Sequence, residues 1–357
     1  MLLVNLGTPR APSAPAVRAF LRELLSDSRL VEKPRWQWWP ILNLFILPSR
    51  PRVYASVYES IWGSGPPLLR ASCELRDAVV GALGRQAALV VHVAIGMRYG
   101  LPSIREALRE LQRKECTRVL VLPLFPQYAS ATVGSVFEAV ATELATWRVV
   151  PALRTIHGYH DDPAYIEALA DSIREVWKSG GEPQKLLFSF HGLPLSHIQA
   201  GDPYYFQCRE TAEQVASVLA LTDERYDVSF QSVFGRDEWV KPSTAHKVHA
   251  MAQAGVTELD VICPGFSVDC LETLWEIDQS NRNLFLTNGG ARFRYVRSLN
   301  ARPEHACMLA ALIERHLAGW IPSPAVRGGH DVAVRRVAVG VGSAGAGSGG
   351  QQRSSIQ

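Results

Sequence analysis

One histidine stands where a short apolar run ends. The stretch Lys185–Pro194 reads Lys-Leu-Leu-Phe-Ser-Phe-His-Gly-Leu-Pro. Its strand-like run Leu186–Phe190 stops at His191, and a glycine and a proline then turn the chain. Ligands of open α/β sheets bind outside the carboxyl ends of the strands, which favours a functional His191. A histidine beside a tight turn can equally do no more than hydrogen-bond a loop carbonyl, so position alone leaves both interpretations open.

Three acidic residues follow a second strand-like run. Asp269, Glu272 and Glu276 lie at i, i+3 and i+7 of a segment that leaves a strand at Cys263. A helix over Ser267–Asp278 would place all three on one face. The three carboxylates could form an ordinary solvated face of a surface helix, or they could be functional residues of a site. A neutral imidazole with one to three carboxylates suits a divalent cation such as Fe²⁺ or Zn²⁺ that is held briefly, or the movement of protons.

The elements that must position these residues alternate along the chain. Strands are expected at 2–5, 88–95, 118–124, 149–156, 186–190, 226–231 and 259–262, and helices at 13–25, 53–61, 68–82, 102–114, 134–146, 162–178, 207–221, 241–254, 267–278 and 302–318. This alternation predicts an α/β protein with parallel sheets built from βαβ units. Two such series predict two doubly wound domains, 1–150 and 151–300, followed by a helix within 301–320. Residues 321–357 are expected to form a disordered tail, because 342–355 is almost all Gly, Ser, Ala and Gln.

Composition narrows the class of protein. Of 357 residues, 47% are apolar and 20% charged, which is a globular balance. The net charge of +3 gives no electrostatic case for nucleic acid. Six scattered cysteines without a Cys-x-x-Cys pair predict free thiols in a reducing compartment. No signal peptide is apparent, and no run reaches the roughly 18 apolar residues of a membrane-spanning helix. We therefore expect a cytoplasmic protein. A nucleotide-dependent dehydrogenase would need a Gly-x-Gly-x-x-Gly loop after an early strand, and the sequence has none.

The segment Trp36–Leu47 is unusually apolar and aromatic. It reads Trp-Gln-Trp-Trp-Pro-Ile-Leu-Asn-Leu-Phe-Ile-Leu, within a proline-rich stretch at 34–51. Its length and prolines rule out a bilayer span. So many apolar side chains are unusual for an exposed loop, and tryptophan suits a membrane interface. The segment is expected either to fold into the core or to touch a membrane surface.

Several short motifs resemble, in order along the chain, those of ferrochelatases, the enzymes that insert Fe²⁺ into a porphyrin. They are Asn5-Leu-Gly-Thr-Pro9, Arg98-Tyr99, Pro126-Gln-Tyr128-x-x-x-Thr132-x-Gly134-Ser135, His191-Gly-Leu-Pro194, Gly201-Asp-Pro-Tyr204, Gln231-Ser232 with Trp239 downstream, and Asp269-x-x-Glu272-Thr-Leu. The resemblance runs from about residue 2 to about residue 320. No single motif is decisive, but their shared order makes the resemblance specific.

The resemblance implies a fold and a set of site residues. Two Rossmann-like domains would enclose a porphyrin cleft with the apolar lip 34–51, and the last helix would pack back on the first domain. His191 and Glu272 would be the catalytic and metal-binding residues, with Asp269 and Glu276 on a metal or proton path. Seven residues would contact the porphyrin: Leu6, Arg50, Tyr58, Arg98, Tyr99, Tyr128 and Trp239. Trp239 could equally be a core residue.

The resemblance also bears on substrate and partners. Leu6 stands where coproporphyrin-using relatives commonly have Tyr, which favours protoporphyrin IX. Many relatives have His at the position of Cys270, so one metal ligand would be missing. The tail lacks cysteine, so no iron–sulfur cluster is expected, and Fe²⁺ is a substrate while no cofactor is bound permanently. Through 36–47 the protein would sit peripherally on the inner face of a membrane. Open alternatives are a chelatase for another porphyrin, such as coproporphyrin III, or for another metal, and a non-catalytic haem or metal carrier.

Overall fold

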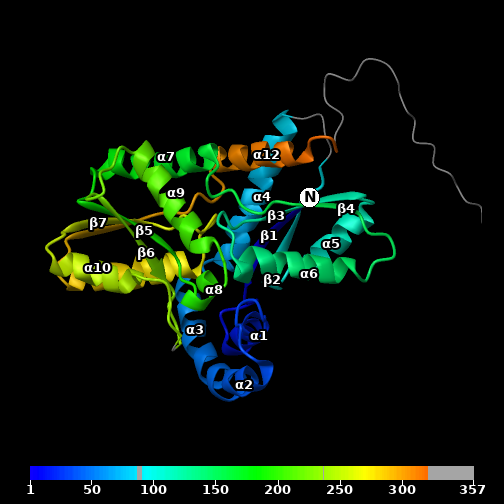
Figure 1. The fold of residues 1–357 in the computed structure, drawn as a ribbon, viewed down its shortest axis with the longest axis horizontal. Coiled ribbons are helices and arrows are strands. Elements are labelled where there is room, and N and C mark those ends of the chain that lie inside the picture. Colours follow the sequence, from blue (N-terminus) through cyan, green and yellow to red (C-terminus); the bar gives the residue numbers. More distant parts are fainter. Residues whose placement is uncertain (87–90, 236, 321–357) are drawn as a thin grey trace, which may run out of the picture. The chain divides into compact units, whose positions relative to one another are not determined.

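Two four-stranded parallel sheets organise the chain, as the alternation of strands and helices predicts (Figure 1). The computed structural model describes residues 1–86, 91–235 and 237–320. The first sheet has the order β2-β1-β3-β4 and comprises β1 (Leu2–Thr8), β2 (Ala94–Gly100), β3 (Arg118–Pro123) and β4 (Ala152–Thr155). The second has the order β6-β5-β7-β8 and comprises β5 (Lys185–His191), β6 (Tyr226–Gln231), β7 (Glu258–Ile262) and β8 (Arg292–Val296).

Helices connect and cover the strands. Those of the first half are α1 (Ala14–Leu25), α2 (Arg35–Pro40), η1 (Ile41–Ile46), α3 (Leu47–Ile61), α4 (Pro67–Gln86), α5 (Ile104–Arg113), η2 (Ser130–Gly134) and α6 (Ser135–Leu144). Those of the second half are α7 (Pro163–Gly180), α8 (Leu195–Gln199), α9 (Tyr204–Val218), α10 (Thr244–Gln253), η3 (Glu272–Asn281), α11 (Arg282–Thr287) and α12 (Pro303–Leu317). The η segments are π-helical. Met1–Leu317 forms one compact unit in which α12 lies against α4 and α7. The tail predicted at 321–357 lies outside the described residues.

The two central strands, β1 and β5, are buried on both faces. Leu186–Phe190 of β5 is buried throughout, which explains its uninterrupted apolar sequence. The core of the first sheet packs β1 and β3 against α5 and α6, and that of the second packs β5 and β7 against α10 and η3. Because the parallel strands of each sheet end at the same edge, the residues that follow neighbouring strands of one sheet are brought together.

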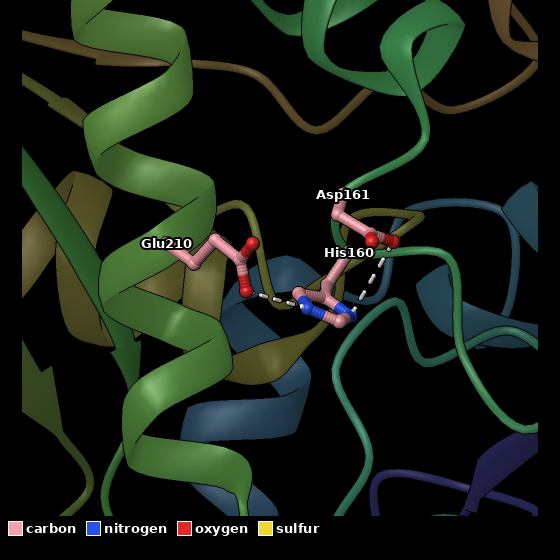
Figure 2. Close-up of side chains that lie close together, drawn as sticks. All are labelled: His160, Asp161 and Glu210. Carbon is pink, nitrogen blue, oxygen red and sulfur yellow. Dashed lines mark hydrogen bonds and ion pairs between the residues drawn. The ribbon is translucent and has the colours of Figure 1, made fainter.

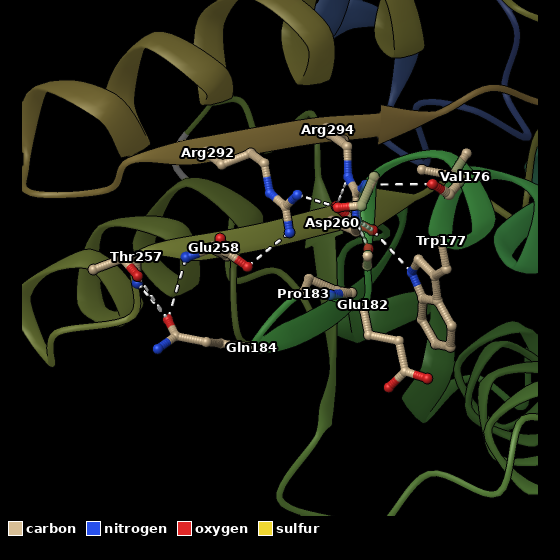
Figure 3. Close-up of polar contacts among 12 residues, drawn as sticks. Val176, Trp177, Glu182, Pro183, Gln184, Thr257, Glu258, Asp260, Arg292 and Arg294 are labelled. Atoms are coloured by element: carbon tan, nitrogen blue, oxygen red, sulfur yellow. Dashed lines mark hydrogen bonds and ion pairs between the residues drawn. The ribbon is translucent and has the colours of Figure 1, made fainter.

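A buried ion pair fixes the edge of the second sheet (Figure 3). Asp260 of β7 is fully buried, and its carboxylate accepts two hydrogen bonds of 2.7 Å from Arg294 of β8 and one of 2.9 Å from the indole N–H of Trp177 in α7. Burial raises the pKa of Asp260, while the guanidinium of Arg294 opposes that rise. These contacts tie β8 and α7 to β7, the strand that leads into η3.

Strand β2 differs from its prediction. A strand was expected at 88–95, with Arg98 and Tyr99 after its end, but β2 spans Ala94–Gly100 and contains both residues. Residues 87–90 lie outside the described part of the chain. The observed strand is held by parallel pairing with β1, in which Gly7 lies opposite Tyr99. Gly7 has φ +117°, and a Cβ there would lie 1.8 Å from the carbonyl oxygen of Tyr99, so only glycine fits.

The helix expected over Ser267–Asp278 begins later than predicted. The regular π-helical segment η3 starts at Glu272, so Asp269 precedes the helix and does not share its acidic face. Strand β8 and the short helices α8 and α11 were not predicted at all. Arginine alternates with Phe and Tyr in β8, and because of these charges the sequence does not read as the apolar run that predicts a strand.

The apolar segment Trp36–Leu47 is helical and has two faces. Pro40 ends α2, and hydrogen bonding continues in the π register of η1 before α3 begins with a proline in its first turn, where proline is tolerated. Leu42, Leu47 and the packed Trp38 form one face, and the indole N–H of Trp38 donates to the carbonyl of Leu25 at 2.6 Å. The other face remains exposed: Trp36, Trp39, Leu44 and Phe45 are between 64% and 76% exposed. Among the described helices none is both long and apolar enough to cross a membrane.

Candidate functional site

His191 lies at the carboxyl end of β5, as predicted, although the strand includes it and does not stop at Phe190, and its ring has a defined orientation. Its Nδ1 lies 2.7 Å from the carbonyl oxygen of Gly192. A carbonyl can only accept, so Nδ1 carries the proton and the Nε2 of the neutral ring keeps a free lone pair. The hydrogen bond to a loop carbonyl and a chemical role are therefore compatible, because the first prepares the second nitrogen to take a proton or a cation.

Glu276 of η3 is held by the residue that follows β6. The backbone N–H of Ser232 donates to one carboxylate oxygen at 2.7 Å, and the Ser232 hydroxyl donates to the other at 2.5 Å. Burial raises the pKa of Glu276. The hydrogen bonds from Ser232 and the nearby His191 act to lower it, and Glu272 acts to raise it. Glu276 therefore lies within electrostatic reach of both His191 and Glu272.

Glu272 borders a small cavity at the carboxyl end of β1. Leu6 from β1, Tyr58 from α3 and Glu272 line this cavity of about 70 Å³, together with Phe125, Phe266 and Cys270. Burial first, and then the charge of Glu272, raise the pKa of the Tyr58 hydroxyl well above its ordinary value. Ligand pockets usually measure ~300–1,000 Å³, so this cavity is smaller than a typical ligand site.

Helix α3 carries further polar groups toward η3. Burial raises the pKa of Tyr54, the charge of Arg50 lowers it, and the charges of Glu272 and Glu276 raise it. Arg50 itself is exposed at the start of α3. One helix therefore presents Tyr54 and Tyr58 to the acidic residues of η3, with Arg50 close to Tyr54, and the sequence analysis missed Tyr54.

Asp269 is a structural acceptor. Its carboxylate accepts hydrogen bonds from Tyr295 at 2.8 Å and Asn300 at 3.0 Å, and it pairs with Arg297 at 3.2 Å. Asn300 also accepts from the backbone N–H of Asp269 at 2.8 Å. These partners come from β8 and from the chain that follows it, which explains why the residue leaves the helical face that its spacing suggested.

Arg98 and Tyr99 share one buried carboxylate. Asp27 accepts from Arg98 at 2.5 Å, from the Tyr99 hydroxyl at 2.8 Å and from Ser135 at 2.5 Å. Although burial acts to raise the pKa of Asp27, the hydrogen bonds from Ser135, the backbone of Arg29 and Tyr99, with the charge of Arg98, lower it. The polar groups of both residues are thus engaged within the protein. No local pattern marks Asp27, because the side chains of Arg98 and Tyr99 that bind it lie more than 70 residues away.

The two remaining predicted contacts are packed aromatic rings. Tyr128 stacks on His157 with ring centroids 4.0 Å apart, and its backbone N–H donates to Gln207 of α9 at 2.7 Å. Trp239 is 8% exposed and lies against the turn after His191, where a Cβ on Gly192 would approach its ring to 3.1 Å. The indole N–H of Trp239 is buried without a partner among the described residues.

A second histidine lies between two carboxylates at the surface (Figure 2). His160 Nε2 is 3.0 Å from Glu210 of α9, and Nδ1 is 3.8 Å from Asp161. Ligand atoms of the three residues lie within 4.8 Å of one another, as in metal sites. Asp161 and Glu210 are both exposed, however, and exposed acidic groups commonly gather without holding an ion. The trio is a histidine bridge between a loop and α9.

The chain matches known proteins over nearly all of the described residues. A family model described as ferrochelatase matches residues 1–317. The ferrochelatase of Nitrosococcus oceani is 49% identical over 324 residues, which cover 90% of this chain and 87% of that protein. The ferrochelatase of Methylococcus capsulatus is 50% identical over 319 residues, covering 89% and 96%. A solved structure of SirB from Bacillus subtilis with Fe³⁺ has a TM-score of 0.52 at 12% identity and covers 72% of this chain and 93% of that one, which supports the fold alone.

Proposed function

Because this chain belongs to the ferrochelatase family and is therefore a metal-chelating lyase, we propose that it inserts Fe²⁺ into protoporphyrin IX, the terminal step of haem biosynthesis, at His191 and Glu272. The observation that carries the proposal is the orientation of His191, whose Nδ1 is occupied by the carbonyl of Gly192. Its Nε2 is thereby left as the basic atom of a ring that interacts with the carboxylates of η3.

Metal insertion requires that two pyrrole N–H protons leave the macrocycle. The neutral imidazole of His191 accepts one of them at Nε2 as a general base, and it must release that proton before it can accept the second. The Nδ1–H···O=C hydrogen bond keeps the ring in one tautomer and stabilises the positive charge that develops on it. A histidine without this hydrogen bond would present either nitrogen, and part of the population would be unproductive.

The carboxylates of η3 attract and release the cation. Carboxylate oxygens and one imidazole nitrogen suit Fe²⁺ without forming a closed cage, so the metal can move on to the porphyrin. In this proposal Glu272 acts at the macrocycle and Glu276 supports metal or proton traffic. Glu272 borders the cavity at the ends of β1 and α3, whereas Glu276 lies one turn farther along the helix.

The porphyrin is proposed to lie against Leu6, Tyr58, Arg50 and Trp239. Leu6 gives the cavity an apolar wall, which suits the vinyl-bearing protoporphyrin IX better than coproporphyrin III. The polar groups of Arg98 and Tyr99 donate hydrogen bonds to Asp27. A contact of these residues with a porphyrin propionate would therefore replace the carboxylate of Asp27 by that of the propionate. Tyr128 would contribute the face of its ring that is not stacked on His157.

The exposed face of α2 and η1 is proposed to rest on a lipid surface. Its tryptophans and Phe45 are the side chains that settle at a membrane interface, and protoporphyrin IX is apolar enough to partition there. The opposite face of the segment is anchored in the protein through Trp38 and Leu42. The chain would then associate peripherally with the inner face of the membrane.

One experiment separates this function from its alternatives. Purified protein is mixed with protoporphyrin IX or coproporphyrin III, Fe²⁺ or Zn²⁺ is added, and the porphyrin absorption spectrum is followed over many equivalents of substrate. We expect repeated turnover with protoporphyrin IX. Faster turnover with coproporphyrin III would favour the other chelatase specificity, and binding without any conversion would indicate a haem or metal carrier.

A further inference from the structure

Ser232 has a backbone conformation that serine rarely adopts. It follows directly after β6 with φ +63°, in the left-handed region that disfavours residues with a Cβ. In this conformation its N–H and its hydroxyl both reach the same side chain, and each donates to a different oxygen of Glu276. Strained residues of this kind are often retained where they serve a site. Here the strain is matched by two hydrogen bonds to one carboxylate.

The preceding residue ties the same point to the rest of the site. Gln231 is the main-chain partner of His191 across β5 and β6, and its carbonyl accepts the N–H of Gly192 at 2.8 Å. The Gln231 amide also donates to the backbone carbonyl of Glu272 at 3.1 Å. The dipeptide Gln231-Ser232 therefore contacts the turn that orients His191 and two turns of η3 at once.

We propose that Ser232 is a positioning residue for cation delivery, fixing both oxygens of Glu276 so that the carboxylate faces the incoming metal in one orientation. The inference rests on the proposed function and adds to it a residue that touches neither porphyrin nor metal. A carboxylate with one donor on each oxygen cannot rotate, yet each oxygen keeps a second lone pair for a cation. Without Ser232 the carboxylate would sample several rotamers, and binding of the metal would have to order it first.

The test uses two matched substitutions and one double-mutant cycle. Ser232→Ala removes the hydroxyl and keeps the same backbone preference. Ser232→Gly also removes the hydroxyl but relieves the left-handed strain and keeps the backbone donor. Zn²⁺ insertion into protoporphyrin IX is measured against Zn²⁺ concentration for wild type, both variants, Glu276→Gln, and Ser232→Ala combined with Glu276→Gln.

We expect both serine variants to raise the KM for Zn²⁺ about tenfold, the lower end of what one hydrogen bond to a charged group contributes, with kcat changed less than about threefold. In the Glu276→Gln background the serine substitution should have little further effect, because it acts through that carboxylate. A merely structural serine would lower the unfolding temperature and leave the KM unchanged. If Ser232→Ala fails to fold, the unstrained glycine variant carries the test.

Two results overturn the inference while leaving the proposed function intact. One is an active wild type whose serine variants keep a normal KM for Zn²⁺. The other is a rise in KM of the same size with and without Glu276. A wild type that inserts no metal into any porphyrin refutes the proposed function itself, and the role of Ser232 then falls with it.

Discussion

Acid is expected to destabilise this fold through a single buried histidine. His305 lies in the first turn of α12 with no exposed surface, and its Nδ1–H donates to the carbonyl of Asn300 at 2.7 Å. Its Nε2 is buried without a partner among the described residues. Burial lowers the pKa of His305 to about 4, although the hydrogen bond to Asn300 opposes this. The folded protein therefore keeps the ring neutral in a pH range where the unfolded chain protonates it.

The sign and size of the effect follow from this difference in pKa. An unfolded histidine titrates near 6.5, so below that pH the unfolded state binds more protons and the free energy of unfolding falls with pH. The loss of unfolding free energy caused by His305 is absent above about pH 7. It reaches about 2 kcal/mol at pH 5 and about 3.4 kcal/mol once the pH is below the folded pKa, at ~1.4 kcal/mol per pKa unit.

Urea unfolding at pH 7.5 and pH 5.0 checks this prediction. The matched control is His305→Asn, whose side-chain N–H can still reach the Asn300 carbonyl but does not titrate. The variant is expected to be less stable at pH 7.5 because it leaves a void. Its loss of stability on acidification should nevertheless be about 2 kcal/mol smaller than that of the wild type. An identical loss in both proteins would refute the reasoning, because the acid sensitivity would then come from other groups.

Three further predictions concern the proposed function. His191→Ala is expected to abolish Zn²⁺ insertion while protoporphyrin IX still binds, because only the proton acceptor is lost. A porphyrin titration measures the binding, and an insertion assay measures the turnover. Near-normal turnover would make His191 a structural residue. Glu272→Gln is expected to lower turnover by at least ~100-fold, whereas Glu276→Gln should mainly raise the Zn²⁺ concentration that gives half the maximal rate; small, equal effects would contradict this division. The wild type is expected to co-sediment with liposomes, and the double variant Trp36→Ser, Phe45→Ser is expected to co-sediment less. The control Val149→Ser changes an exposed site outside the lip and should behave like the wild type. A wild type that stays in the supernatant refutes the lipid contact.

Local signals in the sequence were enough to place His191. An apolar run of strand length ends at a glycine and a proline, and these residues determine both the strand and its last position. The spacing of Glu272 and Glu276 likewise survives in η3, because residues four apart remain about one turn apart. The same spacing failed for Asp269, since its backbone and carboxylate are bound by Asn300 and Tyr295.

Contacts between distant residues account for what the sequence did not show. Asp27 joins Arg98, Tyr99 and Ser135 across more than 70 residues, and no local pattern marks such a carboxylate. Strand β8 looks polar because Arg292 and Arg294 pair with Glu258 and Asp260 of the neighbouring strand. Gln231-Ser232 was noticed only as a motif, because the strained φ of Ser232 has no signature in the sequence.

Helix α3 joins the apolar lip to the acidic residues of η3, and its length sets a distance. It begins at Leu47, beside the exposed side chains, and Tyr58 lies eleven residues later, about 16 Å along the axis at ~1.5 Å per residue. The headgroup layer on each side of a bilayer is roughly 6 Å thick. If the proposed lipid contact holds with the lip at the hydrocarbon boundary and α3 along the membrane normal, the length of α3 would place Tyr58 and Glu272 beyond the lipid headgroups. An apolar substrate could then travel from the bilayer to the carboxylates along one side of a helix, without crossing bulk water.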